Sequence, residues 1–253
     1  MKLTLKISPK EAAAVRKFYK KWETSPLVLS RRSRNLEGRR EPLTEALGWS
    51  AMVSCLLTTQ QRSGPQSPII RFIRTKPFPL SLAAARSQKN VDRWVVATLS
   101  GSRGIRRYNE LARDIGFNFV MLQEGRWSEF MSILRTLEAP HGKLEERRAA
   151  HSVDDLLAGF GPKQARNLLQ TLGLTQHEIP LDSRVAKWLK EFEFPAPVSA
   201  AALGDADFYD FALDGFQEIA AAADVAPCLL DAAIFASFDR AWSEDEVVYC
   251  TLA

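Results

Sequence analysis

Apolar residues recur at helical spacing along most of the chain. They repeat every three or four positions over residues 9–22, 46–57, 105–115 and 127–137. The stretch Ser8 to Glu11 carries a capping box with a proline at the first helical position, and Pro227 opens a last apolar helix. Residues 117–122 are one candidate for a short strand, and no longer run alternates with period two. The pattern predicts an all-α protein of about ten helices.

Composition narrows the class of protein and the compartment. Hydrophobic residues make up 46% and charged residues 25% of 253, which is typical of a globular protein with one large or two small domains. No stretch approaches the ~18 to 20 apolar residues of a membrane span, and the N-terminus lacks a signal-peptide core. Three distant cysteines form neither a disulfide framework nor a metal-binding motif. We expect a cytoplasmic protein without a membrane partner, nucleoid-associated if the source is prokaryotic.

Charge is segregated along the chain. The net charge is only +4, but residues 201–253 carry eleven acids and one base, a net of −10, which leaves +14 on the other 200 residues. A basic body suits a polyanion, and the acidic segment is expected to turn away from it or to lie around the mouth of the site. A basic stretch early in the chain reads either as a solvated loop or as a set of phosphate contacts: Arg31, Arg32, Arg34, Arg39 and Arg40.

A tight hairpin between two helices is the most informative local feature. A short helix capped by Ser152 is expected to end at Gly159. Gly161 permits a second bend, Pro162 takes the first position of the next helix, and Gly173 closes that helix. Exposed backbone N–H groups at a positive helix end form a seat for a phosphate, independent of base sequence. An ordinary turn between helices is the alternative.

Two chemically suggestive residues follow this hairpin. Lys163 lies in the first turn of the second helix, where the helix field lowers the pKa of a lysine. Such an amine is a usable nucleophile that forms a Schiff base with a sugar aldehyde. Asp182, nineteen residues later, takes the N-cap position of another helix, which orients its carboxylate to stabilise positive charge or to accept a proton. A solvated lysine and a purely structural cap are the alternatives.

Together these motifs resemble a known family. The pattern L-x-G-h-G-x-K-x-A over residues 157–165, followed by h-P-h-D over residues 179–182, is similar to the helix-hairpin-helix DNA glycosylase superfamily. The similarity is to its bifunctional lysine-bearing branch, the endonuclease III and 8-oxoguanine glycosylase/AP lyase types. The specific part covers about 40 residues. Looser similarity extends to residues 56–62 and 101–114.

The resemblance implies a fold and a set of site residues. It implies two helical domains with a DNA cleft between them, one at 52–174 and the other formed by 1–51 together with 175–253. Lys163 carries over as the nucleophile and Asp182 as the catalytic carboxylate. The phosphate-binding hairpin carries over to Gly159, Phe160 and Gly161. The wedge carries over to Gln60, Gln61 and Arg62, with Gln60 filling the hole left by the extruded nucleotide. Asn167 could offer its amide to a base edge.

The implied function is excision of a damaged or modified base from double-stranded DNA by a monomer with AP lyase activity. An oxidised purine such as 8-oxoguanine is the first expectation for the base. A monofunctional glycosylase and a non-catalytic helix-hairpin-helix DNA-binding protein are the alternatives. Cys228 and Cys250 stand alone in the C-terminal region, so we expect no iron–sulfur cluster, no other metal and no cofactor. A stacking wall for the base is sought among Phe208, Phe211, Phe235, Phe238 and Trp242, which otherwise read as a core stripe.

Overall fold

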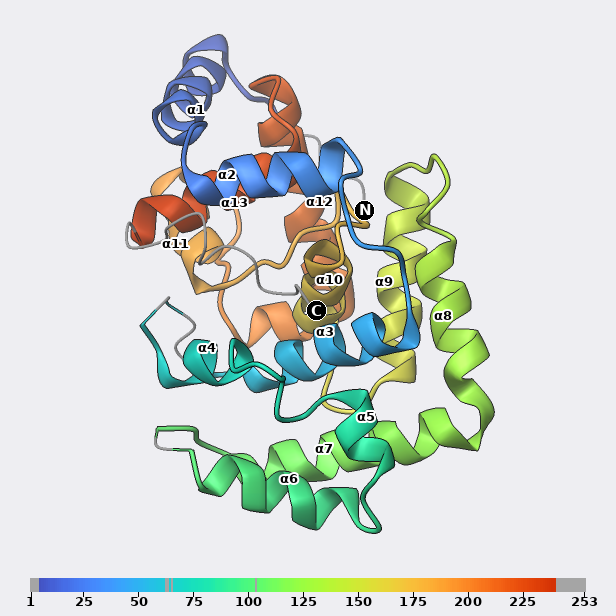
Figure 1. The fold of residues 1–253 in the computed structure, drawn as a ribbon. Helices are drawn as coiled ribbons and strands as arrows, with labels where there is room; N and C mark the ends of the chain where they lie inside the picture. The colour runs from blue at the N-terminus through green and yellow to red at the C-terminus, as the bar shows by residue number, and fades with distance from the viewer. Residues whose placement is uncertain (1–4, 62–63, 65, 103, 240–253) are drawn as a thin grey trace.

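The computed structural model describes residues 5–61, 64, 66–102 and 104–239 (Figure 1). Within this part of the chain every regular element is a helix, which confirms the all-α prediction. The candidate strand at 117–122 is wrong, because these residues end α7 (Tyr108–Met121) and begin a π-helical turn, η2 (Leu122–Arg126). The apolar residues of α7 that face the core are spaced as one helical face, which outweighs a brief alternation.

A first hydrophobic cluster joins the middle of the chain. Its buried residues run from Leu43 to Leu174. They come from α3 (Glu45–Leu57), α4 (Pro68–Ile73), α5 (Leu82–Arg86), α6 (Val91–Ser100), α7, α8 (Trp127–Arg135), α9 (Lys143–Leu156) and α10 (Pro162–Thr171). In Figure 1 α6 and α7 pack side by side at the lower edge, and α3 lies beneath α10.

A second cluster combines the two ends of the described chain. It contains residues of α1 (Pro9–Trp22), α2 (Pro26–Arg31), α11 (Ser183–Glu191), η3 (Ala202–Gly204), α12 (Ala206–Ala222) and α13 (Pro227–Phe238). A π-helical turn, η1 (Arg32–Leu36), extends α2. Residues before 37 therefore share a core with residues after 178, across the top of Figure 1. The division into 52–174 and 1–51 with 175–253 stays a prediction. Buried residues along the length of α3, which begins at Glu45, belong to the first cluster.

The helix before the hairpin is longer than its local sequence suggests. It is α9, which starts after Gly142, where the Glu145 side chain accepts a hydrogen bond from the Gly142 N–H at 3.0 Å. Ser152 therefore lies inside α9, and the prediction that it caps a short helix is wrong. The spacing of Ser152 and Asp155 imitates a capping box, but the upstream residues 143–151 are good helix formers and the helix continues through them.

No single helix in the described ranges is long and apolar enough to cross a membrane. Two helices, α12 and α13, pass that test only together, and they are bent by 94° relative to each other. Most of their apolar side chains lie inside the second cluster.

Candidate active site

Residues of α3 and α7 pack against the hairpin between α9 and α10. Gly159 adopts a φ of +77°, and a Cβ there would lie 2.5 Å from Asp114 Oδ2 and 2.9 Å from Leu56 Cδ2. Asn118 of α7 is fully buried; its Nδ2 donates to the carbonyl of Ala158 at 2.9 Å, and its Oδ1 accepts from the Ala158 N–H at 2.8 Å. The turn therefore requires glycine and presents its outer edge to solvent.

The second helix of the hairpin begins as predicted. Gly161 is the N-cap of α10 in an extended conformation, Pro162 follows at the first helical position, and Gly173 after the last turn has a φ of +74°. Phe160 is half-buried against the first cluster. Backbone N–H groups at this helix start have no intrahelical acceptor, which is the general basis of phosphate binding at such ends.

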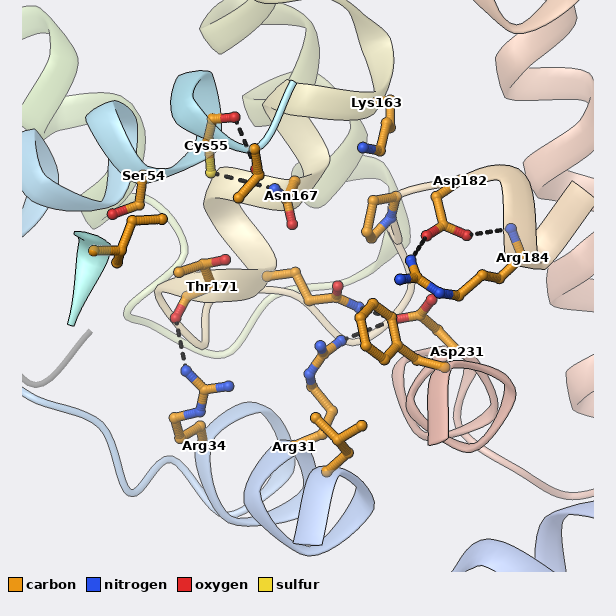
Figure 2. Close-up of a pocket in the computed structure, with 16 residues that line it drawn as sticks. Arg31, Arg34, Ser54, Cys55, Lys163, Asn167, Thr171, Asp182, Arg184 and Asp231 are labelled. Carbon is orange, nitrogen blue, oxygen red and sulfur yellow. Dashed lines mark hydrogen bonds and ion pairs between the residues drawn. The ribbon is translucent and has the colours of Figure 1, made fainter. Parts of the chain in front are cut away.

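Lys163 lies in the first turn of α10 and is half-buried. Figure 2 shows its amine directed into the space that Asn167 and Asp182 also face. No residue in the described ranges forms a hydrogen bond or ion pair with its Nζ. The amine is thus available to a substrate.

Asp182 is the N-cap of α11, as predicted. Its Oδ1 accepts hydrogen bonds from the backbone N–H groups of Arg184 at 2.8 Å and Val185 at 3.1 Å. Its Oδ2 accepts from the Arg184 guanidinium at 2.6 Å. These three donors fix the direction of the carboxylate.

A buried ion pair joins the elements that carry Lys163 and Asp182. Arg166, one turn after Lys163, has no exposed side-chain surface. It donates through Nε to Glu178 Oε2 at 2.6 Å, through a terminal nitrogen to Asp210 at 2.5 Å, and to the carbonyl of Pro162 at 3.0 Å. Glu178 lies four residues before Asp182. The Arg166–Glu178 ion pair therefore links the helix that carries Lys163 to the segment that carries Asp182.

The segment between α10 and α11 is fixed along its length. Glu146 of α9 is buried and accepts backbone N–H groups from Gln176, His177 and Glu178, each at 2.8 Å. Burial raises the pKa of Glu146, and these three donors oppose that shift. Further along, the Tyr209 hydroxyl accepts from the Leu181 N–H at 2.6 Å. Asp182 therefore projects from an immobilised connection.

Two cavities meet at the candidate catalytic residues. An inner pocket of about 130 Å³ and an outer groove of about 1050 Å³ both include Thr58, Lys163, Asp182 and Arg184 in their walls. These four residues form the neck between the cavities. A group that passes from the groove into the pocket must pass the Lys163 amine and the Asp182 carboxylate.

The inner pocket receives side chains from both clusters. Cys55 and Asn167 come from α3 and α10, and the Asn167 Nδ2 lies 3.4 Å from the Cys55 sulfur. From α2 and α13, helices that contribute to the other cluster, come Arg31 and Asp231 (Figure 2). Phe235 of α13 also lines this pocket. Asn167 is thus brought to Lys163 as the helical spacing predicts. The places of Arg31 and Asp231 were not predicted, because their contact spans 200 residues of sequence.

The outer groove contains the hairpin and the end of α3. Gln60 is exposed there with a φ of +54°. Gln61 is tied at both ends of its amide, donating to the Leu57 carbonyl at 2.9 Å and accepting from the Arg106 N–H at 3.0 Å. Arg62, the third predicted wedge residue, lies outside the described residues. Lys187 and Lys190 of α11 also line this groove.

The candidate stacking residues separate into two groups. Phe208 and Phe211 contact each other with ring centroids 5.9 Å apart and pack on the second cluster. Phe235 instead lines the inner pocket and carries the Arg184 guanidinium 3.9 Å from its ring centroid. Phe238 is largely exposed, next to the Lys187 amine, and Trp242 lies outside the described residues.

The arrangement of helices in this protein is similar to the fold of an 8-oxoguanine DNA glycosylase. The comparison of structures finds the 8-oxoguanine DNA glycosylase of Methanocaldococcus jannaschii, with a TM-score of 0.58 and 15% sequence identity over 89% of this chain and 94% of that chain. No family model matches the sequence, and no curated protein matches it. At this identity the likeness establishes the fold. Among the described residues, no group of three or more His, Cys, Asp or Glu side chains is arranged to hold a metal ion.

Proposed function

We propose that the protein is a DNA glycosylase with AP lyase activity. The observation that supports it most is the neck between groove and pocket. There a lysine amine that has no partner among the described residues lies beside an oriented carboxylate. An enzyme that acts on a base takes that base out of the stack. In this proposal duplex DNA lies in the outer groove, the extruded base enters the inner pocket, and C1′ of its sugar stops at the neck.

The chemistry follows from the two side chains. The Lys163 amine attacks C1′ with its lone pair, the Nζ–C1′ bond forms, and the bond from C1′ to the base breaks. The nitrogen then passes its extra proton to the departing base. The carboxylate of Asp182, oriented by three donors, stabilises positive charge at C1′. The C1′–O4′ bond then opens, with O4′ protonated from solvent, and gives the protonated Schiff base. This acidifies C2′, loss of a C2′ proton expels the 3′ phosphate, and water then releases the lysine. This chemistry needs no cofactor.

The substrate we propose is an oxidised purine such as 8-oxoguanine. The structural neighbour is described as an 8-oxoguanine DNA glycosylase, and the two chains share a fold over most of their lengths. The hairpin of Gly159, Phe160 and Gly161 supports the DNA strand through backbone N–H groups. Gln60, exposed in the groove opposite, fills the vacated position in the duplex.

Borohydride trapping tests the role of Lys163. Reduction of the Schiff base should leave a stable protein–DNA adduct on a duplex with a single 8-oxoguanine or a preformed abasic site. Lys163→Gln should abolish the adduct, and Lys190→Gln, a lysine in the same groove, should retain it. An adduct that persists in Lys163→Gln contradicts the assignment. Base release without strand cleavage or adduct would indicate a monofunctional glycosylase, and binding without release a non-catalytic DNA-binding protein.

Asp182→Asn tests the carboxylate. The amide oxygen can still accept the backbone N–H groups of α11, so the helix cap is kept while the negative charge is lost. We expect single-turnover base excision to fall by about 100-fold or more, within the range of 2.7–4 kcal/mol for loss of one electrostatic stabiliser. Duplex affinity should be retained. An unchanged excision rate would remove Asp182 from the mechanism.

A further inference from the structure

An ion pair in the inner pocket is not used by the chemistry above. Arg31, at the end of α2, donates to Asp231 Oδ2 of α13 at 3.1 Å. Both residues line the pocket, with side chains 17% and 8% exposed, respectively. Figure 2 shows the pair on the side of the pocket away from Lys163. A base whose sugar stops at the neck would direct its far edge at this pair.

The pair leaves hydrogen-bonding capacity unused. Both hydrogen bonds that Asp231 accepts, from Arg31 and from the Gln170 amide at 3.1 Å, arrive at Oδ2. Its Oδ1 accepts none from a described residue. The Nε of Arg31 is also buried without a hydrogen-bond partner in the described part of the chain. Buried polar groups are nearly always satisfied in native proteins, so the unsatisfied Arg31 Nε is an exception. Asp231 Oδ1 is not fully enclosed, and it can therefore accept a hydrogen bond from a ligand in the pocket.

We propose that Asp231 and Arg31 read the hydrogen-bonding edge of the extruded base and select bases with a lactam edge, in which a ring N–H adjoins a carbonyl. This proposal rests on the proposed function, because it requires a base in the pocket. The carboxylate accepts from the ring N–H, and the guanidinium donates to the neighbouring carbonyl.

The same pair disfavours the other kind of edge. Derivatives of guanine, hypoxanthine and uracil carry a ring N–H next to a carbonyl. Derivatives of adenine and cytosine carry an unprotonated ring nitrogen next to an amino group. Their ring nitrogen would place a lone pair against the Asp231 carboxylate, and their amino group would meet the Arg31 guanidinium, donor against donor. A mismatched donor or acceptor in a dry pocket remains unsatisfied, which is why such sites discriminate strongly.

Binding in a Lys163→Gln background tests the proposal without requiring turnover. Two matched pairs of lesions differ chiefly at this edge, namely 8-oxoguanine against 8-oxoadenine and 5-hydroxyuracil against 5-hydroxycytosine. Each lesion is placed opposite a tetrahydrofuran abasic analogue, so that base pairing does not contribute. We expect Lys163→Gln to bind the lactam member of each pair about 10- to 100-fold more tightly. The added Asp231→Asn substitution, which offers both a donor and an acceptor, should reduce this ratio to about 3-fold or less.

Control variants separate the reading of the base from the integrity of the fold. Asp214→Asn removes a carboxylate from ion pairs with Lys143 and Arg147 outside both cavities, and should leave the ratio unchanged. Arg31→Lys gives a second measurement if Asp231→Asn fails to fold, and it should also lower the ratio, because a lysine ammonium lacks the planar fork. Equal affinities within both pairs for Lys163→Gln, or a ratio that survives both substitutions, would overturn the proposal.

Cleavage at a preformed abasic site distinguishes this inference from the proposed function. Such a substrate has no base to read. Cleavage of it by the wild-type protein therefore tests the Lys163 chemistry separately from the base preference assigned to Asp231 and Arg31. Absence of cleavage by the wild-type protein, with base preference retained, would contradict the lysine chemistry and leave the assignment of Asp231 and Arg31 standing.

Discussion

At the scale of single residues, the Asp231 carboxyl makes the stability of the folded protein depend on pH. Burial is the largest effect and raises the pKa of Asp231 to about 6. The charge of Arg31 opposes this shift, the charge of Asp182 adds to it, and the hydrogen bond from Gln170 opposes it. In an unfolded chain an aspartate titrates near 3.9. Between these two values the folded protein binds more protons at this site than the unfolded chain, so this group lowers stability as pH rises from about 4 to about 6.

Asp231→Asn should reveal this contribution. Asparagine cannot ionise, so the variant lacks the part of the pH dependence that comes from this carboxyl. We expect its stability relative to wild type to improve between pH 4.5 and pH 7.5. Urea unfolding at the two pH values measures the difference in unfolding free energy. A difference that is the same at both values would show that the Asp231 pKa is not raised.

Residues with a local signature were predictable, and residues that act through distant contacts were not. The N-cap role of Asp182 follows from its position before a helical run, and the joint place of Lys163 and Asn167 follows from their i, i+4 spacing. Arg31 and Asp231 lie in ordinary helical sequence at opposite ends of the chain. Their proximity depends on how α2 packs on α13, which no short motif records.

At the scale of elements, the hairpin uses its two glycines for different purposes. Gly159 is required by the backbone, since its φ is positive and its Cβ position is filled by Asp114 and Leu56. Gly161 is extended, and a Cβ there would meet nothing within 4 Å. The pattern G-x-G predicted two bends from residue types. The structure shows that only Gly159 is conformationally obligatory.

Alanine at each glycine should therefore have a distinct effect. Gly159→Ala should lower stability by about 2 kcal/mol or more, because left-handed backbone costs about 1–2 kcal/mol and the methyl must displace its neighbours. Gly161→Ala should change stability by less than about 1 kcal/mol, because the poorer N-cap preference of alanine opposes the entropy gained by replacing glycine. Its methyl enters the outer groove, so duplex affinity should fall. Thermal unfolding and fluorescence-anisotropy titration measure the two effects. Equal stabilities would contradict the distinction between them.

At the scale of the whole molecule, folding brings part of the acidic segment into ion pairs with the basic body. Three aspartates of the acidic segment form ion pairs with arginines of the basic body. Asp210 contacts Arg166, Asp214 contacts Arg147, and Asp231 contacts Arg31. The first two pairs connect α12 to α9 and α10, and the third lies within the pocket. The expectation that the acidic segment turns away from DNA or surrounds the pocket mouth omitted this role in joining the two clusters.

The buried part of this network should control both stability and the relation of Lys163 to Asp182. Glu178 has no exposed side-chain surface and binds Arg166 at 2.6 Å and Arg147 at 3.0 Å. Glu178→Gln keeps the shape but removes the charge, and removal of one partner of a buried pair typically costs about 3–5 kcal/mol. We expect a loss of about 3 kcal/mol in urea unfolding, and a slower single-turnover excision under conditions where the variant remains folded.

Asp214→Asn provides the matched comparison for Glu178→Gln. Asp214 belongs to the same network through Arg147, but its side chain is 44% exposed, so loss of its charge should cost no more than about 1 kcal/mol. Its excision rate should equal that of wild type, because Asp214 does not touch the segment that carries Asp182. If both variants lose the same stability and activity, general electrostatics would account for the effect. If only Glu178→Gln loses both, the buried ion pair fixes the position of Lys163 relative to Asp182.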